Sequence, residues 1–571
     1  MPSSEPLRDP GEATEAALGL SRSLGLSITV ADALHRAGFT ADERTARFLD
    51  PRLAQLTPPD SMADRALSAD RLARAIREKE RICVFGDYDC DGITAAAILT
   101  GVIRALGGEV VPLLATRQEG SYGLSDRALL RVLDARPSLL VTCDCGSSDH
   151  PRLDRVRAAG IDAVVIDHHL VPPEPLPVLG FLNPHRPDCA FPYKGLASCG
   201  LALSLGAAVR KALGAQLDMR AFLDLVAIGT VADVAPLDGD NRVLVRAGLA
   251  TLASGARPGL RALGQNAKLD PERGVTAEEI AFKIAPRLNA TGRLASPDLS
   301  LALLLERDPA EATRLAAQIE ELSTRRRAIQ EEMVQSALAE IEDADYGSAP
   351  AIVLARQGWH PGVVGIVAGR IAERFRKPTI VVGLEGATGR GSVRGPSGSR
   401  LHDALTRCRS ELVGFGGHQA AAGVEVRADR VSALRDLWCE AFTAAATEGG
   451  ASGSTPSADH GAQADVRLDD RDDPAAVVSD LDRLEPCGEK NRAPLLLVRG
   501  APLSSARDLK GHLKIEIRPR GRSIAGFGFD LGAMAGSLIG RKVDVVGRLR
   551  RDTWRGGDAV ELKIERISAV D

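Results

Sequence analysis

The chain has 571 residues, enough for three or four domains, and its formal net charge of −4 excludes a protein that is basic as a whole. Any contact with nucleic acid would need local basic patches. The N-terminus lacks the basic and apolar regions of a signal peptide, and no stretch reaches about 18 uninterrupted apolar residues. Nine cysteines without paired CxxC motifs fit a reducing compartment. We therefore expect a cytoplasmic protein without a membrane span. We also expect the chain to be a monomer.

Residues 1–70 are expected to form a helical, connective segment. Three short apolar runs follow, and each ends in polar or acidic residues: RICVFG (81–86), SLLVTCD (138–144) and DAVVID (162–167). Helix-like segments lie between them, which is typical of a parallel α/β sheet. Ligands of such sheets gather at the carboxyl ends of the strands. We assign this first α/β domain to residues 71–305.

A single long helix is predicted over 307–343, within a connecting segment at 306–345. Asp308 can cap this helix, Pro309 suits its first turn, and Glu311 completes a start that resembles a capping box. Its apolar residues form only a narrow seam: Leu315, Ile319, Leu322, Ile329, Met333 and Ile341. A long helix with so little apolar surface is expected to bridge two domains.

The C-terminal half contains two further predicted domains. A second α/β domain is assigned to 346–446, with strands near 349–355 and 377–384, and a flexible linker rich in Gly and Ser to 447–464. From 465 to 571 the apolar period becomes two, which predicts a small β-barrel. The stretch 507–571 carries 14 Lys or Arg against 9 Asp or Glu, so this barrel is locally basic.

Acidic and imidazole side chains recur where the predicted strands of the first α/β domain end. They are Asp87, Asp89 and Asp91 in VFGDYDCDG, Asp144 in VTCDCG, Asp167, His168 and His169 in VVIDHH, and Asp233 in GTVADVAPL. Crowded carboxylates must be protonated, paired or bound to cations. Oxygen-rich sites suit Mg²⁺, and an added imidazole favours Mn²⁺. Two such ions would hold a phosphoryl group for in-line displacement.

Each of these residues alone fits an ordinary turn or helix cap, because Asp-Gly is common turn chemistry. The metal hypothesis depends on several strand ends of one sheet carrying ligands. The same motifs, with KIAPRLNATGRL (283–294), GWHPGVVGIVAGRIAERFRKP (358–378) and GFGGHQAAAGVEV (414–426), resemble those of the bacterial RecJ exonucleases within the DHH phosphoesterase superfamily.

The resemblance covers about residues 75–445, and it implies a DHH domain, a DHH-associated domain and a C-terminal OB-fold. It further implies hydrolysis of single-stranded DNA from the 5′ end, in recombination and repair, with two divalent ions, preferably Mn²⁺ or else Mg²⁺. A single-stranded-DNA-binding protein and a helicase are the expected partners.

Roles for individual residues also follow from the resemblance. Asp89 and Asp91 would each bind one metal beside Asp87, Asp144 would bridge the two ions, and His168 and Asp233 would complete their coordination. His169 would face the scissile phosphate, and the catalytic candidates are His169, Asp91 and Asp144. Asp167 would orient His168. The substrate-binding candidates are Arg287, Asn289, Arg293, Arg370, Arg394, Gly416, Gly417 and His418.

Two alternatives stay open at this stage. The chain could be another DHH-type phosphoesterase that acts on short oligonucleotides, nucleotides, cyclic dinucleotides or pyrophosphate, because the metal motifs are shared. It could also be a binding module without catalysis. The intact set of candidate ligands disfavours the second alternative, and the basic barrel favours a polymeric substrate over the first.

Overall fold

The apolar runs of the N-terminal half form neighbouring strands of one sheet in the computed structural model, which describes residues 7–120, 122–417, 419, 421–448, 463–552 and 555–570. The order of this sheet is β2-β1-β3-β4-β5, and all its pairings are parallel. Its strands are β1 (Arg81–Gly86), β2 (Glu109–Leu114), β3 (Leu139–Cys143), β4 (Asp162–Ile166) and β5 (Gly180–Leu182). The predicted parallel α/β sheet is confirmed.

Alternate residues of each strand enter two different cores. Ile82 and Val84 pack with α4, α5 and α8, whereas Cys83 and Phe85 pack with α6 and α7 on the opposite face. Burial on both faces explains why these strands read as continuous apolar runs. The covering helices are α4 (Arg65–Arg77), α5 (Cys90–Ala105), α6 (Asp126–Asp134), α7 (His150–Ala158) and α8 (Ser198–Ala212).

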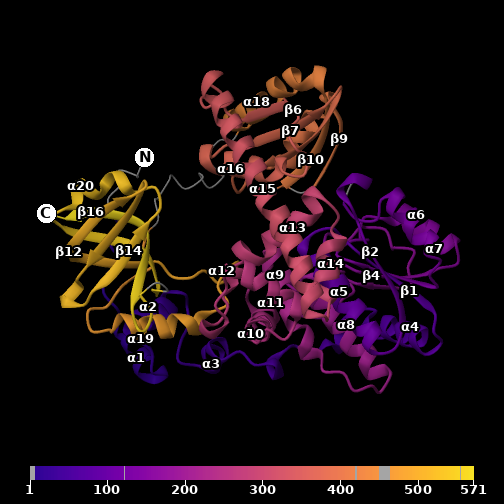
Figure 1. Ribbon diagram of the computed structural model, residues 1–571, viewed down its shortest axis with the longest axis horizontal. Helices are drawn as coiled ribbons and strands as arrows, with labels where there is room; N and C mark the ends of the chain where they lie inside the picture. The colour runs from indigo at the N-terminus through magenta and orange to yellow at the C-terminus, as the bar shows by residue number, and fades with distance from the viewer. Residues whose placement is uncertain are drawn as a thin grey trace.

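A helical layer extends this domain toward the rest of the chain (Figure 1). It consists of α9 (Leu223–Ala232), α10 (Gly239–Ala253), α11 (Pro258–Asn266), α12 (Ala277–Glu279), the π-helical turn η6 (Ile280–Ile284), α13 (Ala285–Leu294) and α14 (Asp298–Leu305). Within the described ranges, every helix is either too short or too polar to pass through a lipid bilayer.

The predicted bridging helix is α15 (Pro309–Asp343), capped by Asp308, whose carboxylate accepts a hydrogen bond from the Glu311 N–H at 2.8 Å. Leu315 and Ile319 belong to the core of the first domain, whereas Met333 and Ile341 belong to the core of the second. One helix therefore ties two cores together and sets their spacing.

The second α/β domain is built on a mixed sheet of order β6-β7-β8-β10-β9, in which only β6 and β7 are parallel. Its strands are β6 (Ile352–Gln357), β7 (Thr379–Glu385), β8 (Thr388–Arg394), β9 (Leu412–Gly417) and β10 (Ala421–Arg427). Its helices are α16 (Val364–Phe375), α17 (Leu401–Arg407) and α18 (Val431–Glu448).

The C-terminal sheet has the order β11-β12-β13-β14-β16-β15, and the additional pairing of β12 with β15 closes it into a barrel. Its strands are β11 (Val466–Arg467), β12 (Leu496–Leu509), β13 (His512–Ile517), β14 (Ile524–Gly528), β15 (Lys542–Arg551) and β16 (Val560–Val570). Two helices, α19 (Pro474–Leu481) and α20 (Ala535–Leu538), accompany them. The predicted OB-type barrel is confirmed.

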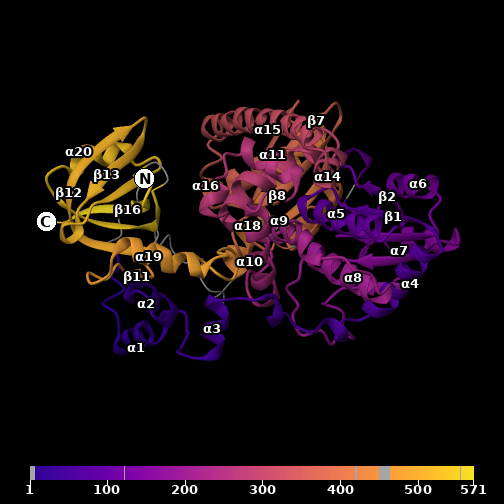
Figure 2. The same cartoon turned by 60° about the horizontal axis from the view of Figure 1, so that its bottom comes forward.

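The N-terminal helices α1 (Glu15–Leu24), α2 (Ile28–Arg36) and α3 (Glu43–Leu49) share a core with this barrel. The Asp472 carboxylate accepts hydrogen bonds from the Ile28 and Thr29 N–H groups at 3.0 and 2.7 Å. Figures 1 and 2 show the barrel and these helices as one lobe beside the two α/β domains. The two ends of the chain thus form a single unit.

Arg242 joins this lobe to the first domain. Its buried guanidinium donates hydrogen bonds to the carbonyls of Phe48 and Leu484, both at 2.9 Å, and lies 3.8 Å from the centre of the Phe48 ring. Arg242 lies in the first turn of α10, the helix that follows Asp233, so the attachment of the barrel lies close in sequence to a candidate metal ligand.

Candidate metal centre

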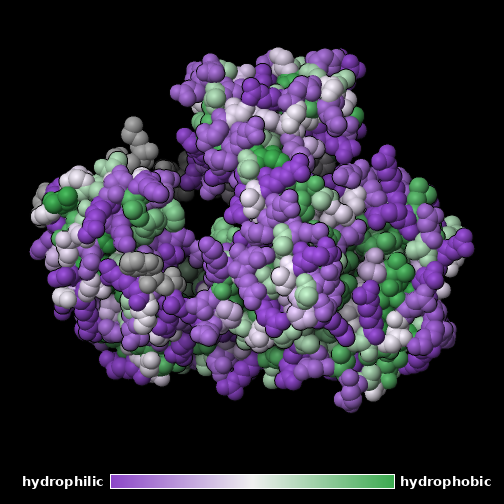
Figure 3. Space-filling view, in the orientation of Figure 1, coloured by the Kyte–Doolittle hydropathy of each residue, from purple (hydrophilic) through white to green (hydrophobic). Residues whose placement is uncertain are grey.

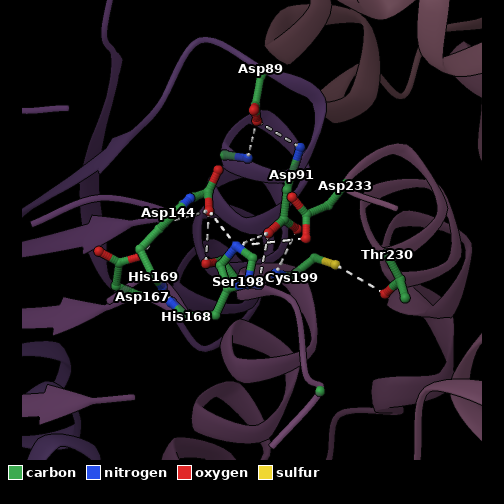
Figure 4. Close-up of polar contacts among 12 residues, drawn as sticks. Asp89, Asp91, Asp144, Asp167, His168, His169, Ser198, Cys199, Thr230 and Asp233 are labelled. Carbon is green, nitrogen blue, oxygen red and sulfur yellow. Dashed lines mark hydrogen bonds and ion pairs between the residues drawn. The ribbon is translucent and has the colours of Figure 1, made fainter. Parts of the chain in front are cut away.

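The predicted ligands converge at the carboxyl edge of the parallel sheet. Asp87 follows β1, Asp144 follows β3, and His168 and His169 follow β4, while Asp233 comes from the end of α9. Figure 4 shows Asp91, Asp144, His168 and Asp233 pointing toward one another. Because β1, β3 and β4 are adjacent in the sheet, residues distant in sequence reach one place.

His168 lies at the centre of this group. Its Nε2 is 3.2 Å from Asp144 Oδ1, 3.7 Å from Asp233 Oδ2 and 3.9 Å from Asp91 Oδ2. Two sets of three residues each place their ligand atoms within 4.8 Å of one another. These sets are Asp91, His168 and Asp233, and Asp144, His168 and His169.

Helix N-termini hold two of the acids. Asp89 caps α5, and its carboxylate accepts hydrogen bonds from the Asp91 and Gly92 N–H groups at 3.1 and 3.2 Å. The buried Asp91 carboxylate accepts from the N–H groups of Ser198 and Cys199, at 2.7 and 2.9 Å, where α8 begins. Unpaired N–H groups and the helix dipole stabilise negative charge at both places.

Asp144 adopts a left-handed backbone with φ of 63°. Its N–H donates to the Ile166 carbonyl at 2.9 Å, its carbonyl accepts from the Tyr122 hydroxyl, and Ser198 Oγ donates to its carboxylate at 3.1 Å. Asp tolerates this conformation better than most residues. The turn directs a fully buried carboxylate into the middle of the site.

The prediction that Asp167 orients His168 is wrong, because the Asp167 side chain contacts the ring of His169. Its Oδ1 lies 2.7 Å from Nδ1 of His169 and reaches His168 only through that residue's backbone N–H, at 2.8 Å. Although burial opposes ionisation, the hydrogen bond from His169 lowers the pKa of Asp167 to about 2. Burial would lower the pKa of His169, but Asp167 raises it to about 9. Asp167 therefore orients His169 and favours its protonated form.

The pKa shifts of the other titratable residues indicate that this site binds cations. Burial and then neighbouring carboxylates raise the pKa of Asp87, Asp144 and Asp233, the last to about 8. Burial lowers the pKa of His168. Asp87 Oδ2 and His168 Nε2 are buried and make no hydrogen bond with the residues that the structure describes. Oxygen donors with one or two imidazoles suit Mn²⁺ and Mg²⁺, so the residues present fit divalent ions.

Several residues that contact the candidate ligands could not be predicted from the sequence. Tyr122, Ser198 and Cys199 each contact a candidate ligand, but they lie outside the motifs that suggest metal binding. Val234, next to Asp233, has a φ of 58° and is 66% exposed. A β-branched residue in this conformation is strained, and such strain clusters at functional sites.

Two of the predicted substrate-binding arginines join a third one between the two α/β domains. Arg293 donates to the Gly362 carbonyl at 2.9 Å, Arg394 donates to Ser392 Oγ at 2.8 Å, and Arg117 lies 4.1 Å from the centre of the Tyr88 ring. Burial, followed by the charges of Arg117 and other arginines, lowers the pKa of Arg293 to about 9. None of the three pairs with a carboxylate among the described residues. We call them the arginine cluster.

The other substrate-binding candidates lie elsewhere. Arg287 pairs with Glu320 of α15 at 2.5 Å, and Arg370 pairs with Glu331 at 3.0 Å, so neither joins the arginine cluster. Asn289 is half-buried on α13. Gly416 and Gly417 end the exposed strand β9, and His418 lies outside the described residues.

Three family models match the chain. They are described as DHH family, N-terminal domain, over residues 81–230, DHHA1 domain over 348–444, and RecJ OB domain over 464–566. These matches, together with the carboxylates at the strand ends, define a protein of the DHH class. The shared architecture extends over all three sheets.

Comparison with individual proteins identifies the family within the DHH class. The single-stranded-DNA-specific exonuclease RecJ of Bacillus subtilis is 32% identical, covering 96% of this chain and 68% of the relative, and that of Dickeya dadantii is 34% identical, covering 87% and 89%. The crystal structure of Thermus thermophilus RecJ with Mn²⁺ has a TM-score of 0.79 at 31% identity, covering 97% of this chain and 78% of that one. A Mg²⁺ complex from the same organism gives a TM-score of 0.74 at 30% identity, over 97% and 77%. This chain belongs to the RecJ family.

Replacing Asp144 with Asn tests two consequences of charge crowding: lower stability without metal, and stabilisation when metal binds. Asn removes one buried negative charge and tolerates the left-handed backbone, so the metal-free variant should be at least as stable as the metal-free wild type. In the wild type, Mn²⁺ at 100 times its Kd should add about 2.7 kcal/mol of stability. The variant should lose most of this gain, measured as the thermal midpoint with and without Mn²⁺.

The matched control is Asp218→Asn, which removes an exposed carboxylate paired with Arg220. This variant should respond to Mn²⁺ as the wild type does. A metal-free Asp144→Asn protein that melts well below the metal-free wild type would contradict the repulsion that we describe.

Proposed function

We infer that this chain is a metal-dependent exonuclease that hydrolyses single-stranded DNA from its 5′ end, in DNA recombination and repair. Its relatives in Bacillus subtilis and Dickeya dadantii are single-stranded-DNA-specific exonucleases, which supports this inference. The observation that carries it is the position of the arginine cluster, which has no carboxylate partner in the described part of the chain, beside carboxylates and imidazoles that could hold a metal ion. The comparisons do not favour a phosphoesterase restricted to short oligonucleotides.

The residues of the metal centre have two roles: binding the metal ions and stabilising charge on the phosphate. Asp89, Asp91, Asp144, His168 and Asp233 would hold two divalent ions, preferably Mn²⁺ or else Mg²⁺, with Asp87 close by. Such ions supply a hydroxide at neutral pH and neutralise charge on the phosphate. His169, oriented by Asp167, whose contact favours the protonated imidazole, would stabilise the negative charge that develops on the scissile phosphate.

The arginine cluster would determine which end of the strand is attacked. Arg117, Arg293 and Arg394 lie where the second α/β domain approaches the first, and planar guanidinium groups bind phosphate oxygens in pairs. A terminal phosphate has fewer neighbours and more charge than an internal one. A strand whose 5′ phosphate occupies the cluster would present a linkage near this end to the metals.

The wider setting is also a proposal. An enzyme restricted to single strands needs a helicase to supply them and encounters the single-stranded-DNA-binding protein that coats them. The cysteines of the chain are free thiols rather than disulfides, which fits the cytoplasm. We propose that the chain acts there as a monomer.

A labelled 30-mer tests the activity and its direction. With Mn²⁺, a 5′ label should appear at once in mononucleotides, whereas a 3′ label should stay on progressively shorter fragments. A circular single strand and a blunt duplex should resist degradation. Asp91→Asn should reduce the rate by at least about a thousandfold, because the ion would lose a buried carboxylate ligand. Cleavage of the circle, early release of the 3′ label, or turnover confined to dinucleotides would contradict the proposal.

The arginine cluster makes a separate prediction. Arg394→Ala should raise the KM for a 5′-phosphorylated 30-mer about 10- to 100-fold, the effect of losing a charge-assisted hydrogen bond. The KM for the same strand with a 5′ hydroxyl should change little. Arg427→Ala, which removes an arginine paired with Asp429 in the same domain, is the control and should leave both values unchanged. Equal effects on the two substrates would contradict a terminal phosphate site.

A further inference from the structure

A row of basic side chains crosses the outer face of the barrel. Neighbouring strands pair Arg507 with Lys514, Lys514 with Phe527, Phe527 with Lys563, and Lys563 with Arg548. Residues directly opposite each other in a sheet project from the same face. Four cations and one aromatic ring therefore form a line over five strands, which we call the barrel row.

Other rings adjoin the middle of the barrel row. The Phe529 ring is 57% exposed, with its centroid 5.0 Å from that of Phe527, and the His512 ring lies 5.7 Å from Phe527 and 5.4 Å from Phe529. Aromatic rings beside cations are what sequence-independent binding of single strands uses, because every base has a face that can stack. The barrel row thus has both components of such a surface.

Close to its Arg548 end, the barrel row contacts the first domain. Lys563 Nζ is 3.0 Å from the Glu278 carboxylate on α12, and the charges of Lys563, Arg548 and Arg550 lower the pKa of Glu278 against the effect of its burial. Figure 3 shows a hollow between the barrel and the helical layer, and Figure 1 places α12 at its border. A strand that leaves the barrel here meets α12 and η6 next.

Phe282 lies in η6, one helical turn beyond Glu278, and is 75% exposed. Its neighbours Ile280 and Ile284 are fully buried, so the turn is anchored while the phenyl ring faces solvent. The Ala285 N–H donates to the Ile280 carbonyl, five residues back, which makes this a π-helical turn. Such turns occur frequently at functional sites, and no packing role within the described residues accounts for an exposed ring here.

The helix that follows η6 leads to the arginine cluster. From Phe282 to Arg293 there are 11 residues of nearly continuous helix, which span about 16 Å at 1.5 Å per residue. Stacked nucleotides advance about 3.4 Å each along a strand. Phe282 is therefore about five stacked nucleotides away from the phosphate-binding end.

We propose that Phe282 is a base-stacking residue that passes single-stranded DNA from the barrel row to the metal centre. The proposal rests on the inferred nuclease function and adds to it a second contact on the same strand. Its ring stacks on a base about five nucleotides from the 5′ end, while cations of the barrel row other than Lys563, which pairs with Glu278, bind phosphates beyond that base.

Strand length provides the test. Phe282→Ala should weaken binding of a 20-mer about tenfold, within the range for one stacked base, and should leave the KM and kcat for a 4-mer unchanged. Phe282→Trp should bind the 20-mer as the wild type does, and Phe282→Leu should not, because leucine restores apolar volume but cannot stack. Fluorescence anisotropy of a labelled strand, in the presence of a metal chelator, measures binding without cleavage.

The dependence of DNA binding on salt concentration distinguishes base stacking from contacts with phosphates. Phe282→Ala should leave the slope of log Kd against log salt unchanged, whereas Arg507→Ala should reduce the slope by about 0.7, the value for one phosphate of a single strand. Leu130→Ala, which truncates a 54% exposed residue on α6, is the control and should change neither affinity nor slope.

The outcomes distinguish this proposal from the function on which it rests. Wild-type affinity of Phe282→Ala for the 20-mer, or an equal loss with the 4-mer, would overturn the role of Phe282 even if the enzyme degrades DNA as inferred. Full rescue by leucine would also overturn it. A wild type that binds the 20-mer through Phe282 but never cleaves it would instead contradict the nuclease function.

Discussion

Mutual repulsion among buried carboxylates is the constraint on which the rest of this structure depends. Asp87, Asp91 and Asp144 are each almost fully buried within one small region, and a buried charge without a partner is very unfavourable. The fold reduces the repulsion with hydrogen bonds from the N-termini of α5 and α8 and from Gly123. Divalent cations remove the remainder, so metal binding and the stability of the first domain are linked.

The other parts of the chain place a substrate against this centre. The bridging helix α15 has one half in each α/β core and holds the two domains at a set separation, with the arginine cluster between them. Arg242 holds the barrel through backbone carbonyls, which requires no partner charge. Because α15 acts through packing and Arg242 through hydrogen bonds, with Lys563–Glu278 as an additional ion pair, salt will weaken DNA binding more than it weakens the arrangement of the domains.

Much of the fold and the outline of the site could be predicted from the sequence. Apolar runs that end in acidic residues predicted the parallel sheet. A capped helix with a narrow apolar seam predicted α15, and alternation of apolar and polar residues predicted the barrel. These features are local, since they depend on residues adjacent along the chain. The convergence of Asp91, Asp144, His168 and Asp233 then followed from the rule that parallel strands end at one edge.

The rest depends on contacts between distant segments, which one sequence does not encode visibly. Asp167 orients His169 rather than His168, and the direction of the side chains after β4 cannot be read from their spacing in the sequence. Ser198 binds Asp91 through its backbone N–H, which almost any residue would supply, and its hydroxyl bond to Asp144 joins segments more than 50 residues apart. Nothing in residues 1–70 indicates that they pack on a barrel more than 400 residues away.

Anomalous diffraction at the manganese edge, from crystals soaked in Mn²⁺, tests the central claim most directly. The account predicts two peaks about 4 Å apart, one contacting Asp91 and Asp233, the other on the side of Asp89, with Asp144 between them and His168 bound to one of the ions. No peak among these side chains at saturating Mn²⁺, or acids that remain paired only with protein groups, would contradict it.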